Sequence, residues 1–76
     1  MLNLEKIRRD TARRLFESGE RIYLLPCKVR VGNPWINPMR ASKNEDTNSF
    51  DNIVSLYEYW NCGSELGKRV AFYREV

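Results

Sequence analysis

Basic side chains are concentrated in the first half of the chain and form its most suggestive chemical pattern. Residues 1–43 carry ten basic and four acidic side chains, whereas residues 44–76 carry three basic and six acidic ones. On a helix, Lys6, Arg9 and Arg13 share one stripe, as a helix lying across phosphates requires. The pattern therefore offers a nucleic-acid surface made of Lys6, Arg9, Arg13, Arg21, Lys28 and Arg30.

Acidic residues at helical spacing favour a different interpretation of the same stripe. Glu5 precedes Arg9 by four positions, and Arg13 precedes Glu17 by four, so these side chains pair along a helix. Interleaved pairs of this kind are typical of a solvated helix face, and the net charge of the chain is only +3. Nucleic-acid binding is therefore kept as the alternative function and not as the leading one.

Two tyrosines and two arginines near the end of the chain form a candidate surface for a protein partner. Tyr59 and Tyr73 each fall on the polar side of the element expected around them, and tyrosine and arginine are enriched at interfaces. Single exposed tyrosines also occur on surfaces that bind nothing. The candidate contact residues are Tyr59, Tyr73, Arg69 and Arg74. Six other aromatic residues are assigned to the core, namely Phe16, Trp35, Phe50, Tyr57, Trp60 and Phe72.

Side chains that would support catalysis are missing or isolated. The chain has no histidine, and Cys27 and Cys62 lie far apart without a second cysteine or a histidine nearby. The carboxylates lack the spacing of a cation-binding loop, and the four glycines are isolated instead of forming a phosphate-binding loop. We therefore expect a non-enzymatic protein with no catalytic residues, no cofactor and no bound metal.

Length and composition predict one small folded domain spanning residues 1–76. The chain is 42% hydrophobic and 30% charged, which is ordinary for a globular protein and argues against disorder. Two cysteines expected to be free thiols, no signal-peptide pattern and no long apolar run predict a cytoplasmic location without membrane insertion.

Five elements must position these side chains. Hydrophobic periodicity predicts a helix over Leu4–Ser18 that Gly19 ends, and a second helix over Phe50–Asn61 that Ser49 caps. The remaining apolar segments predict a central strand at Arg21–Leu25, an edge strand at Trp35–Ala41 and a half-buried strand at Lys68–Val76.

The order of these elements is α-β-β-α-β, which predicts an α+β fold. A right-handed crossing of the second helix would place the last strand beside the first one. We expect a three-stranded antiparallel sheet in the order 2-1-3, with both helices packed on one face.

The second helix and the last strand carry a resemblance to other proteins. The runs Phe50–Val54, Tyr57–Cys62, Glu65–Lys68 and Phe72–Tyr73, together with Tyr23–Pro26 and Trp35–Ile36, make the chain similar to a group of short uncharacterised proteins. These proteins are encoded on conjugative transposons and phages of Gram-positive gut bacteria. The resemblance covers about residues 20–73. It implies an accessory protein of a mobile element and supplies no catalytic or binding residue.

The leading hypothesis is a small binding module that contacts another protein in the setting of a mobile genetic element. It rests on the missing catalytic groups, the small size, the candidate contact residues and the resemblance. The alternative is an accessory protein that binds nucleic acid through the basic first half.

Overall fold

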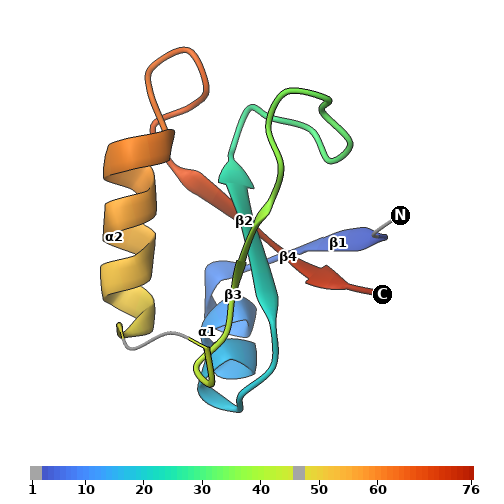
Figure 1. Ribbon diagram of the computed structural model, residues 1–76, viewed down its shortest axis with the longest axis vertical. Helices are drawn as coiled ribbons and strands as arrows, with labels where there is room; N and C mark the ends of the chain where they lie inside the picture. Colours follow the sequence, from blue (N-terminus) through green and yellow to red (C-terminus); the bar gives the residue numbers. More distant parts are fainter. Residues whose placement is uncertain (1–2, 46–47) are drawn as a thin grey trace.

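Four strands and two helices build the fold of this chain. A computed structural model describes residues 3–45 and 48–76 (Figure 1). The elements follow the order β1 (Leu4–Ile7), α1 (Arg9–Glu17), β2 (Ile22–Pro26), β3 (Met39–Ala41), α2 (Phe50–Asn61) and β4 (Val70–Glu75). The strands form one antiparallel sheet in the order β1-β4-β2-β3. The α+β class and the central place of the 21–25 strand between the two expected later strands are confirmed.

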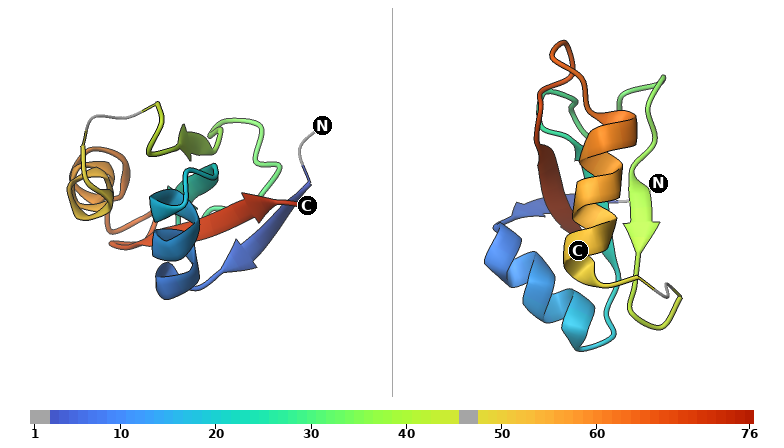
Figure 2. Two further views of the ribbon diagram at one scale, coloured as in Figure 1. Left: turned by 90° about the horizontal axis from the view of Figure 1, so that it is seen from below. Right: turned by 90° about the vertical axis from the view of Figure 1, so that its left-hand side faces the viewer.

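Both helices cover the same face of this sheet (Figure 2, right). From β2 and β4, Leu24 and Phe72 face each other in register and turn toward the helices. Phe50 of α2 stacks on Phe72 with ring centroids 5.5 Å apart. The hydroxyl of Tyr57 in α2 donates a hydrogen bond to the carbonyl of Leu24, at 3.2 Å. These contacts fix α2 against the two central strands.

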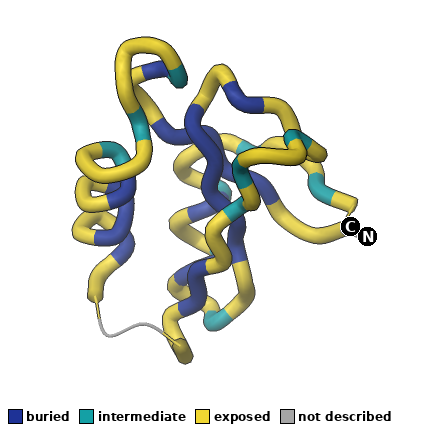
Figure 3. Tube along the Cα trace, turned by 45° about the horizontal axis from the view of Figure 1, so that its top comes forward, coloured by how far each residue is buried: buried dark blue, intermediate teal, exposed yellow. Residues whose placement is uncertain are grey.

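Loops cover the opposite face of the sheet. Tyr23 and Tyr73 face each other there and are both buried. Val29, Ile36 and Leu66, from the segments that follow β2 and α2, pack over them. Buried positions consequently run along β2 and β4 and along the inner sides of both helices (Figure 3).

The first four residues of the expected helix form a strand instead, so the predicted three-stranded sheet is wrong and the sheet has four strands. The helix begins at Arg9, whereas Leu4–Ile7 pair with β4 in the register Leu4–Glu75 to Ile7–Phe72. The N–H of Val76 extends this ladder by donating to the carbonyl of Asn3, at 2.9 Å. A partner strand from the other end of the chain satisfies these backbone groups, and sequence periodicity carries no sign of it.

The presence of β1 also changes the environment of the last strand. It runs over Val70–Glu75, shorter than Lys68–Val76, and both of its faces are buried from Val70 to Tyr73. β4 lies between β1 and β2 instead of at an edge. The prediction of a half-buried strand is wrong because helices cover one face of β4 and loops cover the other.

The edge strand is shorter than the sequence predicts. Only Met39–Ala41 pair with β2, and residues 35–38 are irregular. The side-chain oxygen of Asn33 accepts hydrogen bonds from the N–H groups of Trp35 and Ile36, at 2.8 and 3.1 Å. These local bonds replace strand pairing in this segment.

The predicted closure of the first helix at Gly19 and the predicted Ser49 cap of the second helix are confirmed. After α1, Gly19 has a φ of 89°, its N–H donates to the carbonyl of Phe16, and the N–H of Glu20 donates to that of Leu15. These two bonds form the Schellman closure that a glycine at this position allows. At the start of α2, the Ser49 hydroxyl accepts a hydrogen bond from the N–H of Asn52, at 3.3 Å.

Gly67 connects the loop after α2 to the sheet at a crowded position. Its φ is 89°, and a Cβ placed there would overlap the sulfur of Cys27 and lie 3.3 Å from the backbone nitrogen of Lys28. Two hydrogen bonds hold this junction: Cys27 N–H to the carbonyl of Arg69 and Lys28 N–H to the carbonyl of Leu66. Both the backbone angle and the lack of space therefore require glycine.

We expect the substitution Gly67→Ala to lower the free energy of unfolding by about 2–4 kcal/mol, since strain at positive φ and overpacking add together. Gly32→Ala is the matched control, because Gly32 has a φ of 92° and no atom within 4 Å of an added Cβ. The control should lose about 1 kcal/mol. Urea unfolding measures both values, and equal losses would contradict the crowding at Gly67. Cys27→Ala should recover part of the Gly67→Ala loss.

Candidate functional site

Both tryptophans line a groove between α2 and the edge strand β3, which lie side by side (Figure 2, right). Trp35 is 89% exposed and Trp60 is 74% exposed. Two adjoining hollows of about 260 and 470 Å³ share Met39 and Trp60 as lining residues. We call this surface the tryptophan groove and define it by Trp35, Asn37, Met39, Leu56, Trp60 and Asn61.

Helix α2 supplies one wall of the groove because its apolar stripe is wider than the sheet beneath it. Ile53 and Tyr57 reach the core, whereas Leu56 and Trp60, four positions apart, lie side by side at the border of the stripe. Met39 supplies the opposite wall. It pairs with Leu24, whose side chain faces the helices, so Met39 points toward α2.

Trp35 stands at the end of the groove because the preceding turn holds its backbone. The two hydrogen bonds that the Asn33 side chain accepts fix the start of the segment. Pro34, between Asn33 and Trp35, restricts the backbone further. The side chain of Trp35 is nevertheless left almost free of contacts that exclude water. The same segment places Ile36 inward, where it packs against the loop-covered core.

The tryptophan groove is uncharged. Its described lining residues carry apolar side chains and the amides of Asn37, Asn48 and Asn61, and none carries a formal charge. The surroundings differ, since 30% of the residues in the chain are charged. A groove of this composition favours apolar contact with a few hydrogen bonds from amide groups.

The predicted burial of Trp35 and Trp60 in the core is wrong. Periodicity shows which side of a helix is apolar, but it does not show how far the neighbouring elements extend over that side. Leu56 was the sequence signal for an exposed apolar surface, because it lies just outside the expected apolar stripe and makes that stripe wider than the sheet can cover. The other four core aromatics, Phe16, Phe50, Tyr57 and Phe72, are buried as predicted.

The four candidate contact residues do not form one surface. Tyr59 is exposed, and its ring meets that of Trp60 edge-on with centroids 5.0 Å apart, so it borders the tryptophan groove. Tyr73 is only 8% exposed, and burial raises its pKa, which overturns its assignment to a contact surface. Arg74 is exposed but pairs with Glu5 across β1 and β4, at 2.8 Å. Arg69 is exposed near the start of β4.

The basic stripe of α1 is largely neutralised inside the fold. Arg13 donates hydrogen bonds to both carboxylate oxygens of Asp51 in α2, the shorter at 2.7 Å, and this guanidinium holds the pKa of Asp51 below its usual range. Arg9 lies 3.8 Å from the same carboxylate. Arg21 pairs with Glu45 at 3.5 Å. Three of the six residues in the predicted nucleic-acid surface therefore have a carboxylate partner from residues 44–76.

The other three residues of that surface lie apart along the chain. Lys28 and Arg30 are exposed in the loop after β2, whereas Lys6 is exposed on β1. Lys6 lines a hollow together with Arg9 and with Arg69. The structure does not gather the predicted residues into one continuous basic surface.

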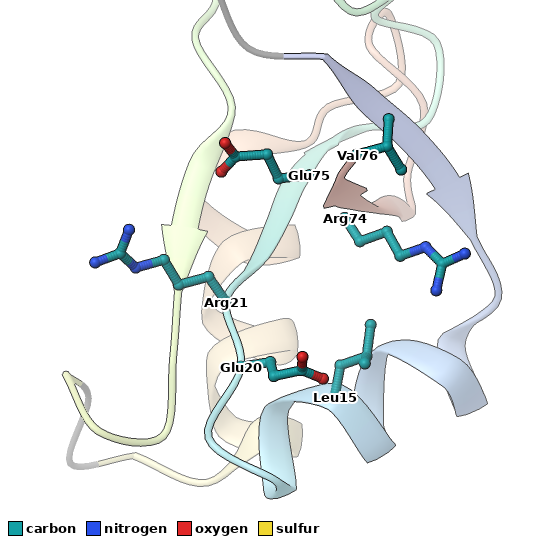
Figure 4. Close-up of a pocket in the computed structure, with 6 residues that line it drawn as sticks. All are labelled: Leu15, Glu20, Arg21, Arg74, Glu75 and Val76. Atoms are coloured by element: carbon teal, nitrogen blue, oxygen red, sulfur yellow. The ribbon is translucent and has the colours of Figure 1, made fainter.

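A hollow of about 450 Å³ lies beside the end of β4 (Figure 4). Two acids and two bases line it, and the side chains of Arg21 and Arg74 point away from each other. Glu75 accepts a hydrogen bond from the hydroxyl of Tyr23, at 3.2 Å. Because these groups are engaged elsewhere or diverge, they provide no set of side chains directed at one ligand.

The two cysteines are free and differ in their surroundings. Cys27 is exposed, whereas Cys62 is partly buried at the end of α2. Burial raises the pKa of the Cys62 thiol, and the nearby charges of Glu58 and Cys27 raise it further. Within residues 3–45 and 48–76, no three metal-binding side chains gather in one place.

Comparison with other proteins leaves function to be inferred from these surfaces. No known protein family, curated protein or solved structure matches the chain. In the described part of the chain, no helix has the length and apolar character needed to cross a membrane. The tryptophan groove is the surface with the least internal explanation, because burying its indoles would stabilise the fold and yet they are exposed.

Both tryptophans of the chain lie in the tryptophan groove, so fluorescence excited selectively at tryptophan reports on this surface. We expect the emission of the free protein to be that of solvated indole and to be quenched by acrylamide almost as efficiently as in the urea-unfolded chain. Trp35→Phe and Trp60→Phe variants resolve the two contributions. Strong protection of either indole at micromolar protein concentration would contradict the open groove.

Burial raises the pKa of Tyr57, beneath the groove, to about 12, against an ordinary value of 10.0. As the pH rises, Tyr57 therefore loses its phenol proton in the unfolded chain before it does so in the folded one. The contribution of this group to the free energy of unfolding is fully present below pH 10 and is lost as the pH rises through about 12. At neutral pH, Tyr57→Phe should lower the free energy of unfolding by about 1 kcal/mol, since it removes the bond to Leu24. This difference should shrink as the pH rises from 10, and urea unfolding across that range tests it. A constant difference would contradict the raised pKa.

Proposed function

We propose that the protein is a non-enzymatic binding module that holds a segment of another protein in the tryptophan groove. The observation that supports this most is the exposure of two tryptophans that line one uncharged groove. Tryptophan is enriched among the residues that dominate the energy of protein interfaces. Tyr59, at the border of the groove, adds a third aromatic ring.

The area of the groove sets the strength of the expected complex. Covering the two indoles removes roughly 300 Å² of apolar surface, or about 7 kcal/mol at 25 cal/mol per Å². Association costs an estimated 4–15 kcal/mol, so the indoles alone give weak binding. A stable complex needs further contacts, which Leu56, Met39 and the amides of the groove are placed to provide.

The partner segment is apolar and uncharged. A charged side chain entering the groove would lose hydration without meeting an opposite charge. An extended conformation fits best, because β3 has a strand neighbour on one side only and its other edge presents unpaired backbone groups. Self-pairing of two β3 edges centred on Arg40 would place two arginines opposite each other, which favours a different protein over a second copy.

An accessory role in a mobile genetic element is the broader proposal, and it rests on the resemblance over residues 20–73. Nucleic-acid binding by the first half has less support, since Arg9, Arg13 and Arg21 have carboxylate partners. The groove and the basic residues also lie on different elements. Protein binding is therefore the function that the geometry supports best.

Selection of ligands from a displayed peptide library tests this function with the intact chain. We expect enriched peptides to be apolar and uncharged and to shift tryptophan emission to shorter wavelength on binding. Trp60→Ser or Trp35→Ser should weaken their binding at least tenfold, as for a central interface residue. Val76→Ser is the control, because Val76 is an exposed apolar residue outside the groove and should leave affinity unchanged.

Two outcomes would overturn the proposal. Peptides whose binding is indifferent to both tryptophan variants would show that the groove is not the binding surface. Analytical ultracentrifugation of the wild-type protein and of Trp60→Ser provides the other test. Self-association that the variant abolishes would show that a second copy occupies the groove instead of another protein.

A further inference from the structure

A cationic hollow lies where β1 ends beside β4. The pairing of β1 stops at Ile7 opposite Phe72, and the chain then turns into α1 (Figure 1). Val70 and Ala71 of β4 therefore have no strand neighbour on that side. A hollow of about 340 Å³ opens at this break in the sheet, and it shares no lining residue with the tryptophan groove.

Three basic side chains from three separate segments line this hollow. Lys6 comes from β1, Arg9 from the first turn of α1, and Arg69 from the residue before β4. One acid, Glu58 of α2, is also present, and its carboxylate accepts a hydrogen bond from the N–H of Val70, at 3.0 Å. Glu58 thus provides the hydrogen-bond acceptor for the backbone N–H of Val70. With three cations and this one acid, the lining has a net charge of about +2.

The three cations of the hollow differ in how they are paired inside the fold. Within residues 3–45 and 48–76, neither Lys6 nor Arg69 has a carboxylate at ion-pair distance. Arg9 lies 3.8 Å from Asp51, but that carboxylate is bonded to Arg13 at 2.7 Å. Three like charges held around one hollow repel one another, and an anion between them would relieve this repulsion.

We propose that the cationic hollow binds a single phosphate group. Two guanidinium groups offer the paired N–H donors that match phosphate oxygens, and the Lys6 ammonium adds a point charge. A dianionic phosphate balances the charge of the lining, whereas a carboxylate would balance only half of it. Because the described lining holds three cations, the hollow is suited to one phosphate and not to a run of them along a strand.

The first test is an NMR titration of the ¹⁵N-labelled protein with inorganic phosphate, with sodium chloride matching the ionic strength. Saturable shifts should appear at the amides of Ile7, Arg9 and Ala71. Arg69→Gln and Lys6→Gln should each raise Kd about two- to fivefold, the size expected for one exposed charge. Arg30→Gln, which removes an exposed charge outside the hollow, is the control and should leave Kd unchanged. Absent saturation, or equal effects of all three variants, would overturn the proposal.

Cys27 gives an independent readout because its exposed thiol also lines the hollow. In a Cys62→Ser background, the rate at which a dianionic aryl disulfide modifies Cys27 is divided by the rate for an uncharged pyridyl disulfide. This ratio should be several-fold higher than the same ratio measured after the additional substitution Arg69→Gln. Inorganic phosphate should slow only the dianionic reagent. Equal rate ratios in both proteins, or equal slowing of both reagents, would show that no anion is concentrated there.

Two further ligands distinguish the source of the phosphate. A nucleoside monophosphate that binds at the same amides would identify a phosphomonoester as a competent ligand. Binding by an oligothymidylate alone, with no response to the monophosphate or to inorganic phosphate, would overturn a single-phosphate site. The Trp60→Ser protein should bind phosphate unchanged, so this test and the groove test fail separately.

Discussion

The pairing of β4 with both β1 and β2 is the interaction on which the rest of the structure depends. It places a segment from the end of the chain in the middle of the sheet, where Phe72 faces the helices and Tyr73 faces the loops. The helix-facing side then gives α2 its packing partner through Phe50. The loop-facing side needs a cover, which Val29, Ile36 and Leu66 provide. Two small cores therefore share one pair of strands.

Local signals predicted the parts of the fold that neighbouring residues determine. The bounds of α2, its Ser49 cap and the Gly19 closure depend on contacts within a few positions, and all three were predicted correctly. The strand at Leu4–Ile7 depends on a partner at the other end of the chain, so periodicity alone assigned it to a helix. The burial of Tyr73 depends on loop residues from distant parts of the chain that pack over it, and periodicity does not show them either.

The candidate sites were harder to predict because exposure depends on where neighbouring elements stop. Trp60 lies on the apolar side of α2, but the sheet ends before it covers that side. Conversely, the basic stripe of α1 was visible in the sequence, whereas its neutralisation by Asp51 required knowledge of how the helices pack. The groove that remains is uncharged, and most of the charges around it are paired within the fold. The sequence thus indicates which side chains are charged or apolar. It does not show which of them remain exposed and unpaired for binding.

The contact between the two ends of the chain also has a consequence for synthesis. Because β1 pairs only with β4, it has no strand partner while the ribosome is still adding the residues between them. Helix α1 and β2 emerge before the segment that completes either core, so β1 and one edge of β2 lack their strand partner until β4 arrives. Folding therefore waits for the last strand, and pairing between distant segments is slow. A truncation that removes β4 leaves an aggregation-prone chain and not a smaller folded unit.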